Sequence, residues 1–435
     1  MNRGKIMAKT KLTPNEKKWI LYDVGNSAFV LLAATLLPIF FHIIGKQDGL
    51  SEHTYLAFVG YASSIATLVS AFVGPIYGAF ADREGKMKRA FLIVIALGSI
   101  GCLAMGFARQ WLLFGIVFII TRIAFNLSLV IYDAMLTDVT TEERVDDVSS
   151  QGYAWGYIGS CIPFIICLVL YVLANQHIIA MSELNAMTIG FSITAIWWFI
   201  CSMPLFKSFK QLNFISEEEA KKNNAIAQLG HSIKDAFTDK KVGLFLLAFF
   251  FYIDGVYTII DMATAYGTSL GLDTVGLLGA LLLTQIVAFP SALIIGKLSK
   301  KYDVTKLIMI CICAYFVFAV YAIFLDKLYE FWILAVAVGM FQGGIQALSR
   351  SYFTKIIPAE KSGEYFGLYD IIGKGATFLG TTLIAVVTQV TGHQNWGVGA
   401  ISSFFVIGLV IFALSLKNSK SEAPEAVPEE TTTEI

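Results

Sequence analysis

The sequence predicts an all-α polytopic membrane protein with twelve transmembrane helices in two six-helix bundles. Of its 435 residues, 56% are hydrophobic and only 15% are charged, whereas charged residues make up roughly 25% of ordinary globular domains. The mean hydropathy of +0.69 also indicates a membrane protein. Apolar runs of about 20 residues, the length that crosses ~30 Å of hydrocarbon, recur along the chain. A soluble enzyme is therefore excluded.

Each half of the chain contains six such runs. The first six are residues 19–44, 54–81, 89–107, 110–137, 150–175 and 186–206. The second six are residues 242–269, 275–298, 306–325, 328–356, 363–390 and 396–416. Several are longer than a bilayer requires, which predicts tilt or extension beyond the membrane.

These runs divide the chain into four parts. We expect an N-terminal bundle over residues 1–206, a cytoplasmic connector over 207–241, a C-terminal bundle over 242–416 and a tail over 417–435. In the connector, apolar residues recur at helical spacing and predict a short amphipathic helix on the membrane face or the bundle; they are Ile226, Leu229, Ile233 and Phe237. The tail is acidic and rich in Pro and Thr, a composition typical of disorder.

The basic residues predict the orientation of the chain. Most of the 32 Lys and Arg residues lie before the first helix, in the connector, in the even-numbered loops and in the tail. Only Lys46, Arg109 and Lys327 lie on the opposite side. By the positive-inside rule, both termini are expected in the cytoplasm. No signal peptide precedes the first helix, and we expect an integral protein of the plasma (cell) membrane.

No motif for enzymatic chemistry or ATP hydrolysis is found in the sequence. It contains no GxxxxGK[ST] phosphate loop, HExxH, GxSxG or Cys/His cluster, so we expect neither an enzyme nor a cofactor or metal site. The net charge of zero does not indicate nucleic acid as a partner. The expected partners are the lipid bilayer, a small-molecule solute and protons as the coupling ion, and the chain is expected to be a monomer.

The two halves share a faint internal repeat. The segment from Gly78 to Lys88 aligns without gaps on the segment from Gly296 to Lys306, each at the end of the second helix of its half. Together with the six-plus-six helix count, this favours parallel repeats about an axis normal to the membrane, which is the plan of the major facilitator fold.

The loop after the second helix carries the sequence GPIYGAFADREGKMKR, from Gly74 to Arg89. It closely resembles the signature of the second-to-third loop in the major facilitator superfamily. The resemblance implies that Gly78 allows close helix packing, and that a cytoplasmic charge latch is formed by Asp82, Arg83, Gly85 and Lys86. The alternative, an ordinary positive-inside loop, explains the basic residues but not the Gly-x3-Asp-Arg-x-Gly spacing.

Polar residues lie within the first and fourth helices. Asp23 and Asn26 share one face of the first helix, and we expect this face to line a cavity; the alternative is a solvated or capping Asp near the interface. Arg122 lies near mid-membrane in the fourth helix, with Asn126 one turn further along. Its position is similar to one that superfamily members use for substrate anions or proton coupling. A purely structural pair of Arg122 with Asp133 is the alternative.

The seventh helix carries Asp254 and Asp261 on nearly the same face, with Thr258 between them. Asp254 lies close to the midplane, where a carboxyl without a counter-charge would hold a proton because burial disfavours the charged form. Asp254 is therefore the leading candidate for proton coupling, while pairing with a base of another helix stays open. The available bases are Arg122, Arg350 and Lys374.

The tenth and eleventh helices carry the remaining charges. Gln342, Gln346 and Arg350 recur every four residues and form one polar stripe. Asp370 and Lys374 are also four apart, so they can meet on one helix face. An ionisable group at mid-membrane costs about 2.5–3.5 kcal/mol on insertion scales. Arg350 is close enough to the cytoplasmic end to act in a gate, and Lys374 is deep enough to reach a substrate. The alternative for Asp370 and Lys374 is a neutralised pair that only tolerates burial.

Several motifs indicate a closer relationship. LYDVGNSAF in the first helix, YIDGVYTII and YGTSLGL in the seventh, and GGIQALSRSYF with GEYFGLYDIIGK in the tenth and eleventh resemble the vacuole-effluxer-like transporters, also called the unknown-major-facilitator family. The resemblance extends from Trp19 to Leu416. It implies a secondary transporter, and the family's eukaryotic members are associated with amino-acid export from the vacuole.

These observations favour transport of a small polar or zwitterionic solute, such as an amino acid, by alternating access with proton coupling. A cavity that offers carboxylates alongside basic groups could contact both ends of a zwitterion. Two alternatives stay open. One is a proton-driven exporter of lipophilic drugs or toxins, and the other is a non-transporting membrane sensor or scaffold organised by the connector and the tail.

Overall fold

The computed structural model describes residues 11–50, 52–216, 218 and 225–421, and nearly all of this part is helical. The N-terminal half contains α1 (Pro14–Gln47), α2 (Glu52–Ala81), α3 (Met87–Met105), α4 (Trp111–Ala134), α5 (Leu136–Val139), α6 (Val145–Asn175) and α7 (Glu183–Ser208). The C-terminal half contains α10 (Lys240–Ser269), α11 (Thr274–Leu298), α12 (Val304–Ala322), α13 (Leu328–Ile356), α14 (Ser362–Thr391), α15 (Gln394–Ala400) and α16 (Ser402–Ser421). Helix α9 (Ala225–Thr238) lies between the halves in sequence.

Twelve helical stretches of the described chain are long and apolar enough to cross a membrane, as the sequence predicts. Helix α1 begins earlier than expected because Thr13 and Glu16 form a capping box: the Glu16 amide donates to Thr13 Oγ1 (3.2 Å) and the Thr13 amide to Glu16 Oε2 (2.7 Å). The segment expected as one helix over 396–416 is instead two helices, α15 and α16, on either side of Ile401.

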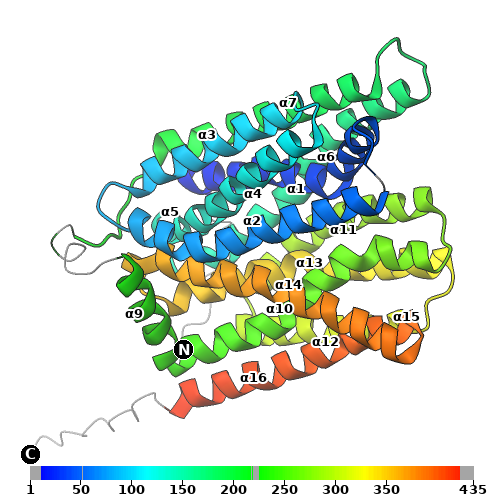
Figure 1. The fold of residues 1–435 in the computed structure, drawn as a ribbon. Coiled ribbons are helices and arrows are strands. Elements are labelled where there is room, and N and C mark those ends of the chain that lie inside the picture. The colour runs from blue at the N-terminus through cyan, green and yellow to red at the C-terminus, as the bar shows by residue number, and fades with distance from the viewer. Residues whose placement is uncertain (1–10, 51, 217, 219–224, 422–435) are drawn as a thin grey trace, which may run out of the picture.

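The helices pack as two bundles that meet along a long interface (Figure 1). Within the N-terminal half α1 packs against α6 and α7, and α4 against α2 and α3; within the C-terminal half α11 packs against α13, and α10 against α14 and α16. Between the halves, α14 contacts α2 and α4, while α6 contacts α11 and α13. We call the end of the molecule at which α9 lies the connector end; α2 and α13 end there, and α6 and α14 begin there.

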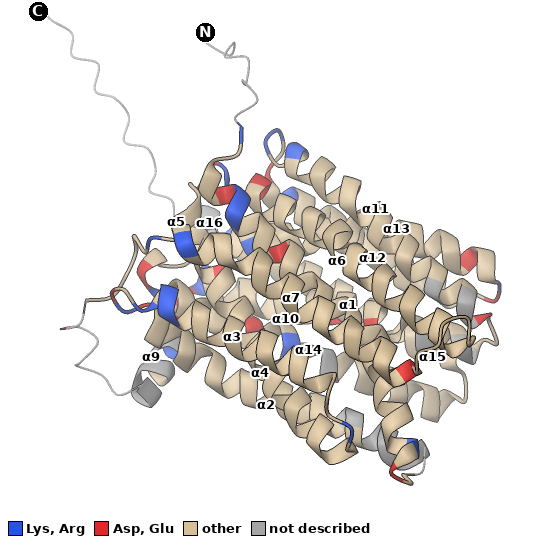
Figure 2. Ribbon diagram, turned by 90° about the horizontal axis from the view of Figure 1, so that it is seen from above, with Lys and Arg blue, Asp and Glu red and all other residues tan. Residues whose placement is uncertain are grey.

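The outer faces of the bundles are apolar. Large hydrophobic side chains such as Ile100, Leu112 and Val317 are at least half exposed, as expected for side chains that face lipid. Figure 2 shows Lys, Arg, Asp and Glu gathered mainly toward the connector end, with a few inside the bundle. The protein is therefore an integral membrane protein whose buried charges need an explanation.

The described part of the connector contains one helix, α9, which contacts α2, α10 and α14. Ala236 is buried on its inner side, while Ile233 and Phe237 are exposed; the side chains of Ile226 and Leu229 lie outside the described part. Of the predicted tail, residues up to Ser421 continue α16, and residues 422–435 lie outside the described residues.

Candidate functional site

At the connector end, α2 of one half and α14 of the other cross with their backbones in contact. A Cβ atom on Gly78 would collide with the carbonyl oxygen of Gly363, and one on Gly367 would collide with the backbone of Pro75. Small residues at a helix crossing allow this close approach. Gly78 therefore lies at a close helix crossing, and its packing partner Gly363 belongs to the opposite half.

Asp82 connects the same two helices electrostatically. Its carboxylate accepts hydrogen bonds from the backbone amides of Gly363 (2.7 Å) and Glu364 (2.9 Å) in the first turn of α14. It therefore caps that helix from the other half and lies at the positive end of its dipole. Burial raises the pKa of the Asp82 carboxyl well above its usual range, and the two amides act in the opposite direction.

The other residues of the predicted latch shape the loop that carries Asp82. Gly85 has a φ of +68°, which favours glycine. Arg83 forms an isolated β-bridge with Ile215, the first part of the connector: the Ile215 amide donates to the carbonyl of Asp82 (2.9 Å). Lys86 is the residue before α3. These contacts tie the loop to the connector, and Asp82 alone of this group makes a described bond to the C-terminal half.

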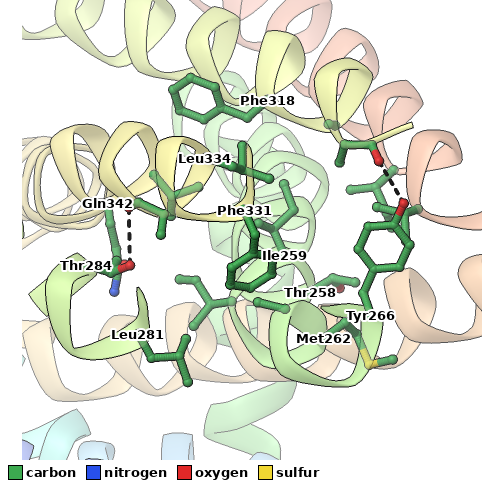
Figure 3. Close-up of a pocket in the computed structure, with 18 of the residues that line it drawn as sticks. Thr258, Ile259, Met262, Tyr266, Leu281, Thr284, Phe318, Phe331, Leu334 and Gln342 are labelled. Carbon is green, nitrogen blue, oxygen red and sulfur yellow. Dashed lines mark hydrogen bonds between the residues drawn. The ribbon is translucent and has the colours of Figure 1, made fainter. Parts of the chain in front are cut away.

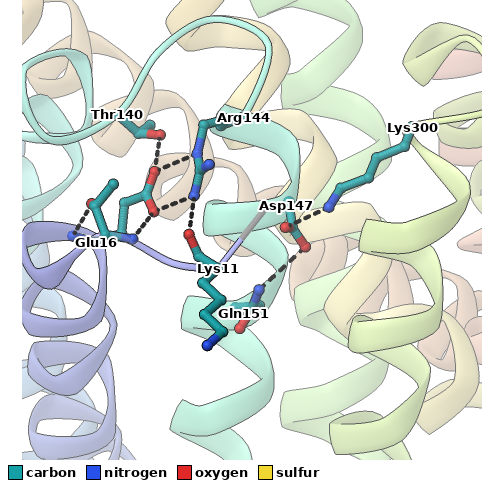
Figure 4. Close-up of polar contacts among 8 residues, drawn as sticks. Lys11, Glu16, Thr140, Arg144, Asp147, Gln151 and Lys300 are labelled. Atoms are coloured by element: carbon teal, nitrogen blue, oxygen red, sulfur yellow. Dashed lines mark hydrogen bonds and ion pairs between the residues drawn. The ribbon is translucent and has the colours of Figure 1, made fainter. Parts of the chain in front are cut away.

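Two ion pairs also join the halves at this end, and both use the start of α6. Lys355 Nζ lies 2.6 Å from Asp146 Oδ2, and Lys300 Nζ lies 2.8 Å from Asp147 Oδ2. Figure 4 shows the Lys300 pair beside Glu16, which bonds to Arg144 and Thr140 within the N-terminal half. Asp146 and Asp147 were not predicted as site residues, although two adjacent Asp residues at a helix start opposite basic loops were a usable signal.

Deeper in the interface, Arg350 of α13 inserts into the N-terminal half. Its Nη1 donates to Asp133 Oδ1 (2.9 Å), its Nε to Ser149 Oγ (2.9 Å) and its Nη2 to the carbonyl of Ser149 (3.0 Å). Nη2 also lies 3.7 Å from Asp23 Oδ2. We call Arg350, Asp23, Asp133 and Ser149 the Arg350 cluster. It joins α1, α4 and α6 of one half to α13 of the other.

Aromatic rings surround this guanidinium. Its central carbon lies 4.3 Å from the ring centroid of Tyr153, 4.7 Å from that of Trp19 and 5.5 Å from that of Tyr132. Trp19 and Tyr132 stack on each other at 4.2 Å. A planar guanidinium suits such stacking better than an ammonium does. The sequence did not identify these rings, because aromatic residues are common in every span.

A second group of charges lies further from the connector end. Lys374 Nζ and Asp370 Oδ1 of α14 are 2.5 Å apart, so the predicted pair is present. Arg122 of α4 interacts electrostatically with Asp370 and with Asp261 of α10. Asp261 is exposed. We call these four residues the central charge cluster; it contains groups of both signs and both halves of the molecule contribute to it.

The sequence left open a structural pair of Arg122 with Asp133, and the structure instead bonds Asp133 to Arg350. Asp23, expected in the cavity, belongs to the Arg350 cluster, where Asn26 Nδ2 donates to it at 3.4 Å. Asn126 Nδ2 donates to Ser70 Oγ (3.0 Å) and so joins α4 to α2. Helical spacing gives the face of a residue but not the helix that this face meets.

Asp254 lies within the C-terminal half. It is fully buried, and its Oδ1 accepts hydrogen bonds from Thr258 Oγ1 (3.0 Å) and the Gly380 amide (3.2 Å). Among the described residues it forms no ion pair, so the possible pairing with Arg122, Arg350 or Lys374 is not seen. Its contacts join α10 to α14 inside one bundle.

An apolar cavity of about 80 Å³ lies beside Thr258 inside the C-terminal bundle (Figure 3). Its lining is mainly aliphatic and aromatic, with Gln342, Thr258 and Thr284 among the polar exceptions. Gln346, one turn further along α13, is buried. The sequence did not predict this cavity, because its walls come from several helices that each read only as apolar.

The chain shares its fold with solved transporters of the major facilitator superfamily. It matches the fucose transporter FucP in the outward conformation with a TM-score of 0.69 and 14% identity, over 92% of this chain and 98% of that chain. It matches the proton:xylose symporter XylE with a TM-score of 0.66 and 12% identity, over 92% and 94%. At this identity the likeness establishes the fold alone.

Sequence relatives are more specific. The chain is 40% identical over 428 residues to the uncharacterized MFS-type transporter YxiO of Bacillus subtilis, covering 98% of this chain and 97% of that protein. It is 21% identical over 473 residues to autophagy-related protein 22 of Kluyveromyces lactis, covering 94% and 95%. Two bundles of membrane-spanning helices, joined by a closed charged interface, thus define a transporter of the major facilitator superfamily. The family model described as "Vacuole effluxer Atg22 like" matches residues 49–424, and the chain belongs to that family.

Proposed function

We propose that the protein is a secondary transporter that moves a small polar or zwitterionic solute, of the amino-acid type, by alternating access with proton coupling. The observation that carries this proposal is the central charge cluster, in which Arg122 of one half interacts electrostatically with Asp261 and Asp370 of the other. A zwitterion presents one charge of each sign, and this cluster can pair with both.

The position of the cluster also suits alternating access. Its groups belong to α4 on one side and to α10 and α14 on the other, so a solute bound among them contacts both halves. The latch and the Arg350 cluster lie between it and the connector end. A solute bound in the cluster would therefore reach the connector end only after that end opens. We place the connector end in the cytoplasm and the protein in the cell membrane, following the distribution of Lys and Arg.

Binding is tested by thermal unfolding of the purified protein against a panel of amino acids and other small metabolites. A ligand at 100 times its Kd stabilises the folded state by about 2.7 kcal/mol. We expect at least one zwitterionic solute to raise Tm in the wild type and in Lys301→Met, an exposed lysine of the loop after α11. The same solute should have no effect on Lys374→Met. Equal shifts in both variants would remove Lys374 from the binding site.

The apolar cavity favours one alternative, a proton-driven exporter of lipophilic compounds. A compound that occupies this cavity would lose its site in Ala335→Trp, because the added ring fills the space beside Phe331 and Leu334. Under this alternative, Ala335→Trp abolishes resistance of a hypersensitive host to the compound, and Lys374→Met leaves it intact. The opposite pattern supports the polar solute.

A further inference from the structure

We propose that Asp23 and Asp133 together hold one exchangeable proton while the connector end is closed, and that they release it when Arg350 leaves them. The proposal rests on the proposed transport function and assigns the proton-binding step to the Arg350 cluster. The first observation is the unequal charge of the cluster: one guanidinium contacts two carboxylates, at 2.9 Å and 3.7 Å. Arg350 and Asp23 are 2% and 6% exposed.

The second observation is that the remaining bonds of the cluster are neutral. Asp23 accepts from the hydroxyl of Tyr132 (3.1 Å) and from Asn26 (3.4 Å), and Arg350 donates twice to Ser149. None of these partners supplies a second positive charge. The site is largely buried, with the Asp133 side chain 17% exposed. Two ionised carboxylates and one guanidinium would give it a net negative charge, which burial disfavours. One proton shared by the pair neutralises it.

The third observation concerns the charges that face the cluster from neighbouring helices. They alternate in sign from the Arg350 cluster to the central charge cluster, because Asp133 interacts with Lys374, Lys374 with Asp370, Asp370 with Arg122 and Arg122 with Asp261. Together with Asp23 and Arg350, these groups make four carboxylates and three bases. The charged groups that face the pair are Arg350 of α13 and Asp370 and Lys374 of α14. The tyrosines that face it come from five helices and are Tyr22, Tyr132, Tyr153, Tyr157, Tyr257 and Tyr369. Asp146 and Asp147 at the start of α6 are matched by Lys355 and Lys300.

The location of the pair couples its proton to the conformation. Asp23 and Asp133 belong to the N-terminal half and Arg350 to the C-terminal half, so opening the connector end separates them. Packing is tight here, since a Cβ on Gly152 would lie 2.9 Å from Asp23 Oδ2 and 3.1 Å from Arg350 Nη2. When the halves part, water reaches the pair and favours two ionised carboxylates. The protonated carboxyl then loses its proton to water at the connector end.

The sign of the effect follows directly. Closing the connector end takes up a proton, so acid conditions favour the closed state and alkaline conditions favour the open state. Spin labels at Glu84→Cys and Glu360→Cys, exposed positions in the segments that follow α2 and α13, report the distance between the two halves at the connector end by pulsed EPR in nanodiscs. The background carries Cys313→Ser, since Cys313 is exposed and the other five cysteines are buried. No solute is added.

From about pH 5 to about pH 9, a range that spans the ordinary and the raised pKa of a carboxyl, we expect the closed population of the wild type to fall. Asp133→Asn, which cannot release a proton, should stay closed throughout. The control Asp147→Asn removes a carboxylate of the same interface outside the pair and should keep the wild-type pH response. Asp23→Asn tests the same pair independently if Asp133→Asn does not fold.

A wild-type distance that does not change with pH, or an Asp133→Asn response equal to that of the wild type, would overturn the proposal. Because the experiment contains no solute, either result leaves the proposed transport function to be judged by the binding screen. Conversely, a failed binding screen does not alter what these distances report.

Discussion

Arg350 and Asp254 are both charged residues buried in apolar helices, yet their surroundings differ in kind. Arg350 crosses from one half to the other and meets two carboxylates, Ser149 and three aromatic rings. Asp254 stays inside one half, and its described bonds come from a hydroxyl and a backbone amide. Arg350 can therefore change partners when the halves move, whereas Asp254 keeps its partners. We infer that Arg350 serves the transport cycle directly, and that Asp254 supports the packing of α10 on α14.

The largest effect is expected for Arg350→Ala. It leaves the buried Asp23 without its positive partner and removes the guanidinium from Asp133, and breaking a buried ion pair in this way costs about 3–5 kcal/mol. The closed population between labels at 84 and 360 should disappear. Arg350→Lys should recover it only in part, because an ammonium lacks the fork that bonds Asp133 and Ser149 together. If Arg350→Ala kept the closed distance, the cluster would not hold the interface.

Asp82→Ala should have the next largest effect. It removes the cap of α14 that the other half supplies, and loss of such a cap costs about 0.5–2 kcal/mol. The same pulsed EPR distance should shift toward the open state, whereas the stability of each bundle changes little. Lys86→Ala in the same loop serves as the control, since the described hydrogen bonds of Lys86 use only the backbone. Equal effects of the two variants would argue against capping.

Asp254→Asn tests whether Asp254 affects only the stability of its own half. An amide oxygen can still accept from Thr258, so we expect a loss of about 0.5–1.5 kcal/mol in the free energy of unfolding. The connector-end distance and its pH response should match those of the wild type. If Asp254→Asn abolished that pH response, Asp254 would be the coupling group, as its depth in the sequence first indicated.

The smallest effect is expected for Lys300→Ala. Its ion pair with Asp147 is partly exposed, and exposed pairs contribute about 0–1 kcal/mol. The closed population should fall slightly, and the change should vanish in high salt, where screening is strong. A salt-independent loss as large as that of Arg350→Ala would show that the exposed rim, and not the buried cluster, closes the connector end.

The helices could be predicted because the length of an apolar run is a local property of the sequence. The pairing of Asp370 with Lys374 could also be predicted, because the two residues are one helical turn apart. The partners across the interface could not be predicted. Asp133 and Arg350 are 217 residues apart, and the helix spacing allowed Arg122 as an equal partner for Asp133. The aromatic rings around Arg350 and the apolar cavity could not be predicted for the same reason. Each is formed by several helices, and the sequence of one helix does not show which other helices it contacts.

Measuring solute flux is the strongest test of proton-coupled transport of a zwitterionic solute. Purified protein in proteoliposomes, under an imposed pH gradient, should accumulate at least one zwitterionic solute, and an ionophore that collapses the gradient should stop it. Lys374→Met should abolish this flux and Lys301→Met should preserve it. A correctly folded protein that moves no member of an amino-acid panel would contradict the proposed transport function. Equal flux in the wild type and Lys374→Met would contradict the proposed role of the central charge cluster.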